Sequence, residues 1–389
     1  MMPRSGEKLR IVLGAVISLV PFSAGMAWNW MQWAVGLRRL GHDVIYLEQV
    51  DPAWCVDEHG NACPPEVSIN RDLFVATMQR FGFQGSSWQI DHCGEPLAGT
   101  RHELDRRLAG TDLLLNMAGH IRSDSVLEAT ARRVYVDQDP VYTQLWRAVY
   151  GKELGFDRHD VFATVGLNIG TAATDVPSCG LDWRHVLPPV VLDFWTEPDV
   201  LSGGRFTTIA SWESFGDLHY EGRWYRGKRA SFERVAGLPR HVPDQEFELA
   251  LRRQHPDDET LARRHGWHVV EAGRAAGDLD AYRNYVIASR GEVGIAKDAY
   301  LTATSGWFSD RSAHYLAAGR PVVAQATGVE RHLPAGTGLI VFDTCESAAD
   351  ATEAVNSAYR LHSRAARELA AEHLDYRAVL PAFLGACLS

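Results

Sequence analysis

One stretch, residues 306–328 (GWFSDRSAHYLAAGRPVVAQATG), limits the fold of this chain more than any other. Ser309 is a natural N-cap for a helix, and Gly319 is placed to end that helix at its C′ position. The apolar run at residues 321–324 then suits a short strand buried in a parallel sheet. A helix followed at once by a buried strand predicts an α/β fold.

The start of this helix is also a predicted anion site. Its first N–H groups have no partner within the helix, and the helix dipole makes this end positive. Phosphate is the usual ligand of such an end. Ser309, Asp310, Arg311 and Ser312 are therefore expected to bind an anion, and the guanidinium of Arg311 could add a bidentate contact.

This stretch resembles the donor-binding element of the GT-B glycosyltransferases, in which a helix N-terminus faces the diphosphate of a sugar nucleotide. The closest resemblance is to actinobacterial glycosyltransferases related to the CgeB/YkvP-like group. The matching segments are SRGE at residues 289–292, GWFSDRS at 306–312 and AGRPVV at 318–323, with weaker matches in VDQDP at 136–140 and LRRLGH at 37–42.

The resemblance implies two Rossmann-like, doubly wound domains that face each other across a cleft. It implies a glycosyltransferase of the hexosyltransferase class, which moves a sugar from a nucleoside-diphosphate sugar, such as a UDP-sugar, to a hydroxyl of a small acceptor in specialised metabolism. Such enzymes work without a metal, so neither a metal nor a resident cofactor is expected. A GT-B-like sugar-nucleotide epimerase and a noncatalytic nucleotide-sugar-binding protein stay open as rival functions.

One position departs from the family pattern. Many GT-B enzymes hold the donor ribose with a glutamate inside this helix, and the matching residue here is His314. Glu292, in what reads as a tight charged loop, is expected to hold the ribose instead. The other residues of the expected donor site are Arg290, Lys297, Thr327 and Gly328.

Chain length and charge limit the organisation and the partners. A chain of 389 residues is too long for one compact core. We expect an acceptor domain at residues 1–200, a donor domain at 201–375, and a tail at 376–389 that crosses back onto the first domain. The formal net charge of −10 argues against a nucleic-acid partner.

The N-terminal segment allows two interpretations. Three basic residues precede an apolar run at residues 11–24, which imitates a signal peptide. We favour a first buried strand at 11–20, because a helix at 28–40 and a strand at 43–48 complete a βαβ unit. No apolar run reaches the ~18–20 residues that a membrane span needs. A cytoplasmic protein with reduced cysteines is expected, and a Cys55–Cys63 disulfide is the minor alternative.

The same βαβ unit carries candidate acceptor residues. The loop at residues 14–18 (GAVIS) lacks the G-x-G-x-x-G fingerprint, so NAD is discounted. Gly25 lies in a small-residue loop that would let an acceptor approach. Trp28, Trp30 and Trp33 follow, and three tryptophans so close together are not all expected in the core. Core packing of one or two of them and an aromatic acceptor platform that includes Trp28 both stay open.

Polar side chains follow two more expected strands, at residues 113–117 and 133–137. In open α/β sheets the ligand crevice lies at the carboxyl ends of the strands. Asp137 is the preferred catalytic base and His120 the alternative, and Asp139 is expected to bind the acceptor. Two structural roles also stay open: a turn-forming acid before a proline, and a loop histidine that is only hydrogen-bonded.

The remaining pattern predicts further elements by residue range. Expected strands are at 162–165, 206–211, 267–271 and 285–288. Expected helices are at 71–81, 244–254, 346–359 and 362–373, and residues 212–229 read as an aromatic, charged loop.

Overall fold

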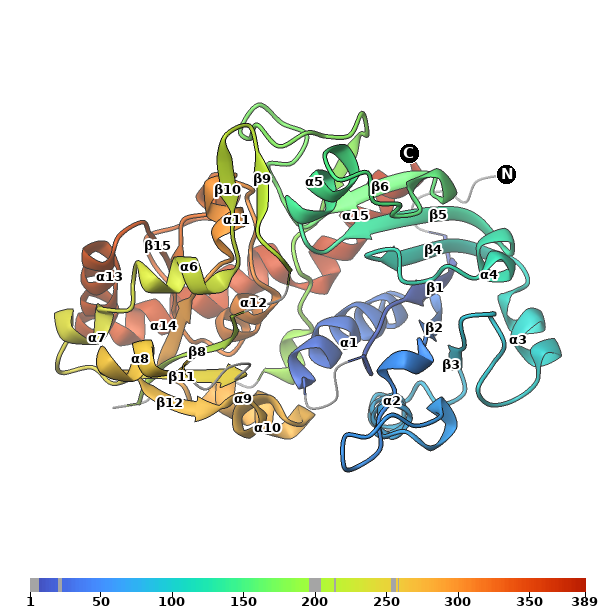
Figure 1. Ribbon diagram of the computed structural model, residues 1–389, viewed down its shortest axis with the longest axis horizontal. Coiled ribbons are helices and arrows are strands. Elements are labelled where there is room, and N and C mark those ends of the chain that lie inside the picture. Colours follow the sequence, from blue (N-terminus) through green and yellow to red (C-terminus); the bar gives the residue numbers. More distant parts are fainter. Residues whose placement is uncertain (1–6, 20–22, 196–203, 213–214, 253–256, 258) are drawn as a thin grey trace.

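Two parallel β-sheets, each flanked by helices, divide the chain into two α/β domains (Figure 1). The computed structural model describes residues 7–19, 23–195, 204–212, 215–252, 257 and 259–389. The expected domain boundary at residues 200–201 lies outside these ranges. The predicted fold class of two doubly wound domains is confirmed.

The first sheet has the strand order β3-β2-β1-β4-β5-β6-β7, and all its strands are parallel. Its strands are β1 (Arg10–Gly14), β2 (Asp43–Gln49), β3 (Ser87–Ile90), β4 (Thr111–Met117), β5 (Thr130–Asp137), β6 (Val161–Thr164) and β7 (Trp183–His185). Its helices are α1 (Ala24–Arg39), α2 (Ile69–Arg80), α3 (Arg101–Leu108), α4 (Asp124–Glu128) and α5 (Tyr142–Ala148), with 3₁₀ turns at Pro52–Trp54, Pro65–Val67, Phe156–Arg158 and Leu192–Phe194. The strand expected in the N-terminal apolar run is β1, which lies between β2 and β4.

The second sheet has the order β12-β11-β8-β13-β14-β15 and is also parallel. Its strands are β8 (Phe206–Ser211), β11 (Phe247–Arg252), β12 (His268–Glu271), β13 (Gly291–Gly294), β14 (Val322–Gln325) and β15 (Leu339–Phe342). A separate antiparallel hairpin consists of β9 (Leu218–Tyr220) and β10 (Arg223–Tyr225). The helices are α6 (Lys228–Glu233), α7 (Leu238–His241), α8 (Thr260–Arg264), α9 (Ala272–Ala276), α10 (Leu279–Ala288), α11 (Asp298–Thr302), α12 (Asp310–Ala317), α13 (Cys345–Ser357), α14 (Tyr359–Leu369) and α15 (Tyr376–Leu388), with a 3₁₀ turn at Val329–Arg331 and a π turn at Ala370–Leu374.

Four predicted segments of the second domain are wrong. One is the loop expected at residues 212–229, which contains the hairpin of β9 and β10 and the start of α6. Residues 244–254 were expected to be helical, but Phe247–Arg252 is strand β11, because alternate apolar side chains enter the core between β8 and β12. Residues 285–288 belong to helix α10, which Asp278 caps by accepting a hydrogen bond from the Ala281 N–H. The segment around Glu292 is strand β13 rather than a loop.

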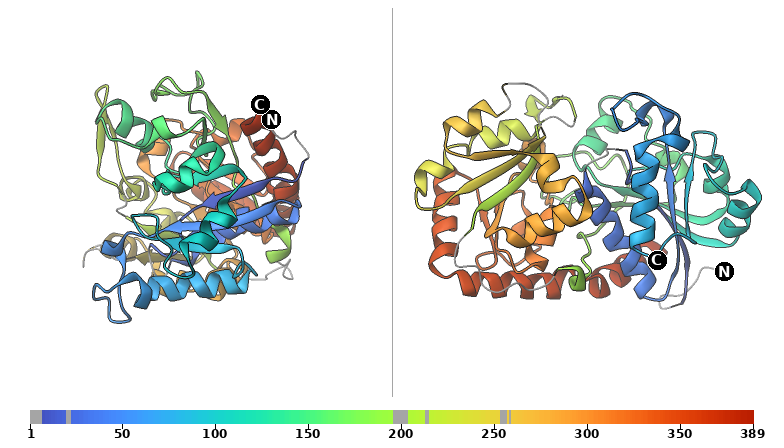
Figure 2. Two further views of the ribbon diagram at one scale, coloured as in Figure 1. Left: turned by 90° about the vertical axis from the view of Figure 1, so that its right-hand side faces the viewer. Right: turned by 90° about the horizontal axis from the view of Figure 1, so that it is seen from below.

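Helix α1 lies at the junction of the two domains. It contacts α10 and α12 of the second domain and, on another side, the C-terminal helix α15. Trp33 meets Phe383 of α15 edge to face, with the ring centroids 5.4 Å apart. Figure 2 shows the C-terminal helices running along one side of the molecule from the second domain to the first.

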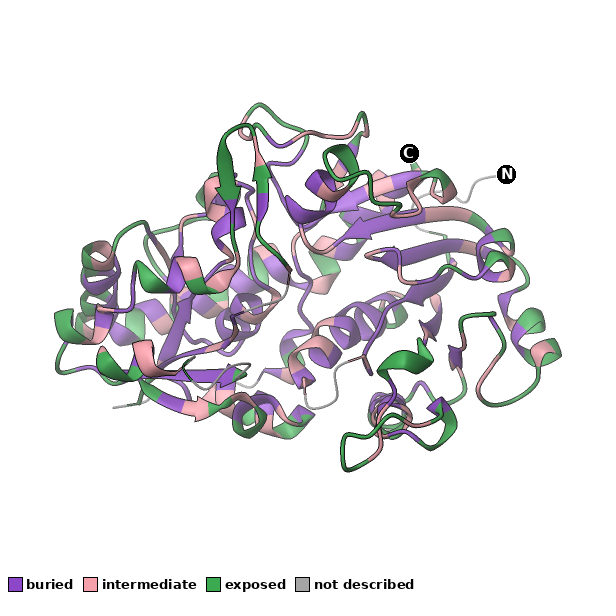
Figure 3. Cartoon of the chain, viewed as in Figure 1, coloured by how far each residue is buried: buried purple, intermediate pink, exposed green. Residues whose placement is uncertain are grey.

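Both sheets are buried over most of their length (Figure 3). One cluster of buried apolar side chains joins residues of β1, α1, α12 and α15. Within the part of the chain that the structure describes, no helix is both long enough and apolar enough to cross a membrane.

Candidate functional site

A cleft of about 360 Å³ lies between the domains. The first domain lines it with residues that follow β1, β4, β5 and β6, which are the carboxyl ends of its strands. The second domain lines it with the starts of α6 and α12 and the segment after β13. The polar and charged lining residues are Ser23, Asn29, His120, Gln138, Asp139, Lys228, Lys297, Tyr300 and Asp310.

His120 follows β4 and lies in the cleft wall, as expected. The chain turns sharply there, with a positive φ at Ala118 (52°) and at Gly119 (68°). Burial, assisted by the positive charge of Arg122, lowers the pKa of His120 to about 4, although Asp139 opposes the shift. The imidazole is therefore neutral at pH 7 and can accept a proton.

Asp137 does not project into the cleft, and that expectation is wrong. Its side chain is fully buried, and four groups donate hydrogen bonds to its two carboxylate oxygens. The donors are Thr143 Oγ1 (2.6 Å), the Asp139 N–H (3.0 Å), Gln144 Nε2 (3.0 Å) and Thr164 Oγ1 (2.7 Å). Burial raises the pKa of Asp137. This carboxylate ties the end of β5 to β6 and α5 and does not face a substrate.

Asp139 and Lys297 lie in the cleft and bond to each other across the two domains. Lys297 Nζ donates to Asp139 Oδ1 at 2.6 Å, and the Tyr300 hydroxyl donates to the same oxygen at 3.0 Å. The Lys297 ammonium also lies 4.1 Å from the centre of the Phe215 ring. An expected acceptor residue and an expected donor residue are thus neighbours.

Lys228 is a cleft residue that the sequence interpretation missed. It begins α6 and lies inside the segment that was expected to be a loop. Burial lowers the pKa of its ammonium well below the usual value, and the cations Arg311 and Lys297 lower it further. The available signal was a lysine at a helix start (GKR, residues 227–229), which is weak without the tertiary structure.

The helix predicted from Ser309 is confirmed as α12. The Ser309 hydroxyl accepts a hydrogen bond from the Arg311 N–H at 3.2 Å and so caps the helix. Asp310, in the first turn, lines the cleft, while Ser312 is buried. The positive end of α12 therefore reaches the cleft wall.

Arg311 and Glu292 form a pair beneath this helix. Arg311 Nε donates to Glu292 Oε1 at 2.6 Å, and Nη1 donates to the carbonyl of Ile209 at 2.9 Å. Glu292 is fully buried in β13. Among the described residues, neither Glu292 Oε2 nor Arg311 Nη2 has a hydrogen-bond partner. The expected contacts of Arg311 with an anion and of Glu292 with a ribose are not prepared in this arrangement, because the two side chains face each other.

Replacing Arg311 with alanine is expected to destabilise the fold by about 3–5 kcal/mol, because it leaves the Glu292 carboxylate buried without its cation. Urea unfolding measures the change. The double variant Arg311→Met/Glu292→Gln, which removes both charges, is the control and should recover much of the loss. Unchanged stability together with weaker nucleoside-diphosphate binding would instead show that Arg311 serves the ligand.

Other expected donor residues lie away from the cleft wall. Arg290 precedes β13, at the amino end of that strand and away from the cleft, and it donates to Asn356 Oδ1 at 2.5 Å. Thr327 is buried, and its hydroxyl donates to the carbonyl of Trp307 at 2.6 Å. Gly328 (φ 89°) is pressed against the first domain, since a Cβ there would lie 2.7 Å from Asn168 Nδ2. These residues shape the second domain and the domain junction.

Trp28 belongs to the domain junction and not to an acceptor platform. It is buried, its indole N–H donates to the carbonyl of Leu279 at 2.8 Å, and its ring lies 5.2 Å from that of Trp195. Trp30 and Trp33 are buried as well, so the expectation that the three could not all be core is wrong. The reason is that helices from both domains surround α1.

Gly25 and His314 also belong to this junction. A Cβ at Gly25 would lie 3.3 Å from the ring of Tyr282. His314 is buried, stacks on Trp195 at 4.6 Å and hydrogen-bonds the Tyr282 hydroxyl through Nδ1 at 2.9 Å. Burial lowers the pKa of His314 to about 3. The position aligned with the family's ribose-binding glutamate thus faces the first domain.

A second cavity of about 370 Å³ adjoins the cleft and shares Val16, Leu19 and His120 with it. Glu48, at the end of β2, lines this cavity and is 1% exposed. Its Oε1 accepts hydrogen bonds from the Ser18 N–H (2.9 Å) and hydroxyl (2.6 Å). Burial raises the pKa of Glu48 to about 7.

The Glu48 carboxyl should make stability depend on pH. Its pKa is about 7 in the folded chain and ordinarily 4.5, so the unfolded chain ionises first and stability falls as the pH rises between these values. Glu48→Gln removes this cost and is expected to stabilise the protein by ~2–3 kcal/mol at pH 8, with little effect near pH 4. Urea unfolding at both pH values tests this, and a variant less stable than the parent at pH 8 would contradict it.

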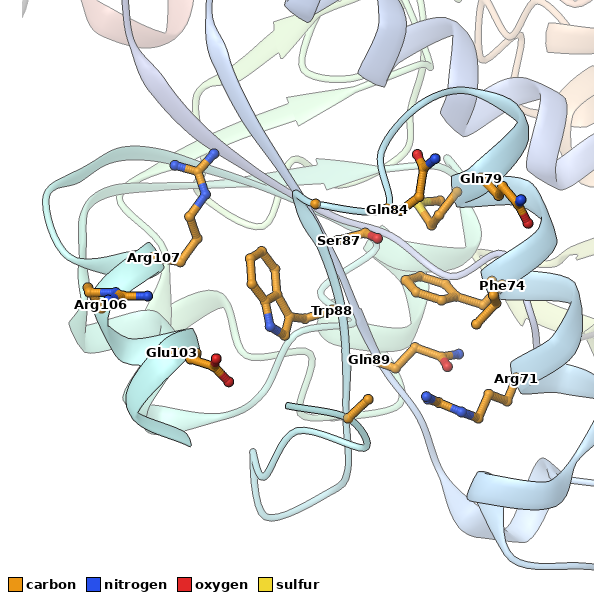
Figure 4. Close-up of a pocket in the computed structure, with 14 residues that line it drawn as sticks. Arg71, Phe74, Gln79, Gln84, Ser87, Trp88, Gln89, Glu103, Arg106 and Arg107 are labelled. Atoms are coloured by element: carbon orange, nitrogen blue, oxygen red, sulfur yellow. The ribbon is translucent and has the colours of Figure 1, made fainter. Parts of the chain in front are cut away.

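Another hollow, of about 570 Å³, lies elsewhere, at the edge strand β3. Trp88 stands on one side of the strand and Phe74 and Gln89 on the other (Figure 4). It shares no lining residue with the interdomain cleft. Among the described residues, one group close enough to share a metal ion, Asp91, His92 and Cys93, lies on a turn outside the cleft.

No protein-family model and no curated protein matches this sequence. Solved structures do match over nearly the whole chain. An α-glucosyltransferase in complex with UDP and DNA is 11% identical, with a TM-score of 0.61, over 98% of this chain and 100% of its own. AviGT4, a glycosyltransferase involved in avilamycin A biosynthesis, is 15% identical, with a TM-score of 0.57 and 97% of each chain covered. HepE from Anabaena, in complex with UDP-glucose, is 12% identical, with a TM-score of 0.57, over 97% of this chain and 99% of its own.

These matches cover both domains and show that the chain has the GT-B glycosyltransferase fold. At such low identity they show the fold alone. The closer resemblance to the CgeB/YkvP-like group remains a prediction.

Proposed function

We propose that this chain is a glycosyltransferase that moves a sugar from a nucleoside-diphosphate sugar, with a UDP-sugar as the favoured donor, to a hydroxyl of a small acceptor. The observation that carries the proposal is the composition of the cleft. One wall presents His120, a neutral base, and the other presents Lys228, Lys297 and the start of α12. Glycosyl transfer needs one group that takes the proton of the acceptor hydroxyl and another that stabilises the leaving diphosphate.

The second domain would stabilise the leaving diphosphate. Two ammonium groups and the positive end of a helix are groups that favour the charge that develops on a departing phosphate. Because protein cations can neutralise that charge, the proposed reaction uses no metal. Lys297 would exchange its contact with Asp139 for a phosphate oxygen, which would release the Asp139 carboxylate into the cleft.

The first domain would bind and activate the acceptor. His120 lies on this side, and its neutral imidazole can accept the proton of the attacking hydroxyl. Asp139 would bind the acceptor or orient His120. This assignment replaces Asp137, whose oxygens are occupied by four donors within the fold.

The similar structures support the donor class and leave the acceptor open. One of them holds UDP and DNA, another UDP-glucose, and a third takes part in avilamycin A biosynthesis. The net charge of −10 favours a small acceptor over DNA for this chain. We also propose that the enzyme is cytoplasmic and acts in specialised metabolism.

A thermal-shift screen against nucleoside diphosphates and nucleotide sugars tests the donor assignment, since a ligand that binds only the folded state raises its stability. UDP is expected to give the largest shift. Product analysis with the selected nucleotide sugar, alone and with an acceptor panel, then tests the reaction. An epimerised donor without acceptor, or tight donor binding without turnover on any acceptor, would overturn the proposal.

A further inference from the structure

The second cavity contains a polar group that the fold leaves unsatisfied. Glu48 Oε2 is buried and no described residue lies in hydrogen-bond geometry to it, although Oε1 has two donors from Ser18, and the nearby Gln89 side chain and Ile17 N–H lower the pKa of the carboxyl. A buried carboxylate oxygen without a donor is costly. The Glu48 side chain is held in place, because Asn70 Nδ2 donates to the Ser18 carbonyl at 2.6 Å and so fixes the loop that bonds Glu48. A donor group from a ligand would satisfy this oxygen.

The rim of the cavity carries an unusual aromatic side chain. Trp54 lines the cavity and is 59% exposed, which places a large apolar face beside the buried carboxylate. His120 lies in the wall shared with the cleft, so a ligand in the cavity would reach the group that we propose as the base. The volume lies at the lower end of the range for small-molecule sites.

We infer that this cavity binds the acceptor and that the acceptor carries a polyhydroxylated ring, such as a sugar or a cyclitol. Such a ring offers hydroxyl donors to Glu48 Oε2 and presents an apolar C–H face to Trp54. A flat phenol with one hydroxyl cannot satisfy Glu48 and also present a second hydroxyl at His120. The inference deepens the proposed function and rests on it, because it names the acceptor class of the same site.

Saturation-transfer NMR tests this with the full chain at pH 8, where most of the Glu48 carboxyl is ionised, and at a saturating concentration of UDP. The probes are myo-inositol and methyl α-glucopyranoside as polyols, and p-nitrophenol as the single-hydroxyl aromatic. Both polyols are expected to show transfer to their ring C–H protons. Glu48→Gln, which keeps the shape but places an amide there, and Trp54→Ala should each raise the polyol Kd by about tenfold or more, the scale of a lost hydrogen bond to a charged group.

Glu66→Gln, which changes an exposed acid outside the cavity, is the control and should leave polyol binding unchanged. UDP affinity, measured by calorimetry, should be the same in all variants and also shows that each is folded. Binding of p-nitrophenol in preference to both polyols, no polyol binding by the parent protein, or a polyol Kd unaffected by Glu48→Gln would overturn the inference. If UDP binds but the polyols do not, only this inference fails, whereas absence of UDP binding is the failure of the proposed donor site.

Discussion

Replacing His120 with glutamine is expected to lower kcat by ~10²–10⁴-fold, the usual contribution of a general base. Glutamine keeps a polar side chain of similar size but cannot take up a proton at neutral pH. UDP affinity should not change, because the cations that would bind the diphosphate, Lys228 and Lys297, lie on the opposite wall. A near-normal kcat in the folded variant would show that the base lies elsewhere.

The pH dependence gives a second measure of the same role. A histidine base acts only when neutral, so activity must fall as the pH drops through its pKa. Because burial lowers the pKa of His120 to about 4, the acid limb of kcat/KM should lie near pH 4 instead of near neutrality. The residual activity of His120→Gln should lack this limb. Asp137→Asn is a useful contrast, since it disturbs a buried hydrogen-bond network and should lower stability more than it changes the pH profile.

Local signals explain which parts of the fold could be predicted. The helix from Ser309 to Gly319 was predictable because its cap, its buried face and its terminating glycine all lie within the same stretch. Strand β11 was not, because Glu248, Leu249 and Ala250 are good helix formers and only the neighbouring strands β8 and β12 make the segment extended. Pairing with the neighbouring strands therefore outweighs the helix propensity of this segment.

The candidate site was less predictable because it depends on the direction of side chains. Asp137 ends the buried strand β5 and His120 follows β4, but only the structure shows that Thr143, Gln144 and Thr164 enclose the aspartate. Arg311 was correctly placed at the helix start, yet it turns to a glutamate in β13. Partners that lie far apart in the sequence decide which polar group remains available to a ligand.

Lys228 is a cleft residue that the sequence did not reveal. Nothing in its own segment marks it as a site residue, and its position matters only because α6 begins beside Lys297 and the start of α12. Carboxylates lie among these groups as well, since Asp139 bonds Lys297 at 2.6 Å and Asp310 lines the same cleft. Burial lowers the pKa of Lys228, and the nearby cations Arg311 and Lys297 lower it further.

Replacing Lys228 with methionine is expected to lower kcat by ~10²–10³-fold, the scale seen when one group that stabilises a developing negative charge is removed. Methionine keeps much of the apolar stem and removes the ammonium. UDP affinity should fall as well, because the diphosphate loses a cation in both the bound substrate and the product. Lys152→Met, which changes an exposed lysine outside the cleft, is the control and should leave both quantities unchanged.

Proton uptake distinguishes a direct contact from a structural effect of Lys228. The bound diphosphate favours the charged ammonium, so UDP binding should raise the pKa of Lys228 and take up protons at pH values above its pKa in the unliganded chain. Calorimetry of UDP binding at pH 8 in phosphate and in Tris, whose ionisation heats differ, measures the number of protons taken up. The parent protein and Lys152→Met should show uptake that Lys228→Met lacks. An unchanged UDP affinity together with an unchanged kcat in Lys228→Met would remove Lys228 from the donor site.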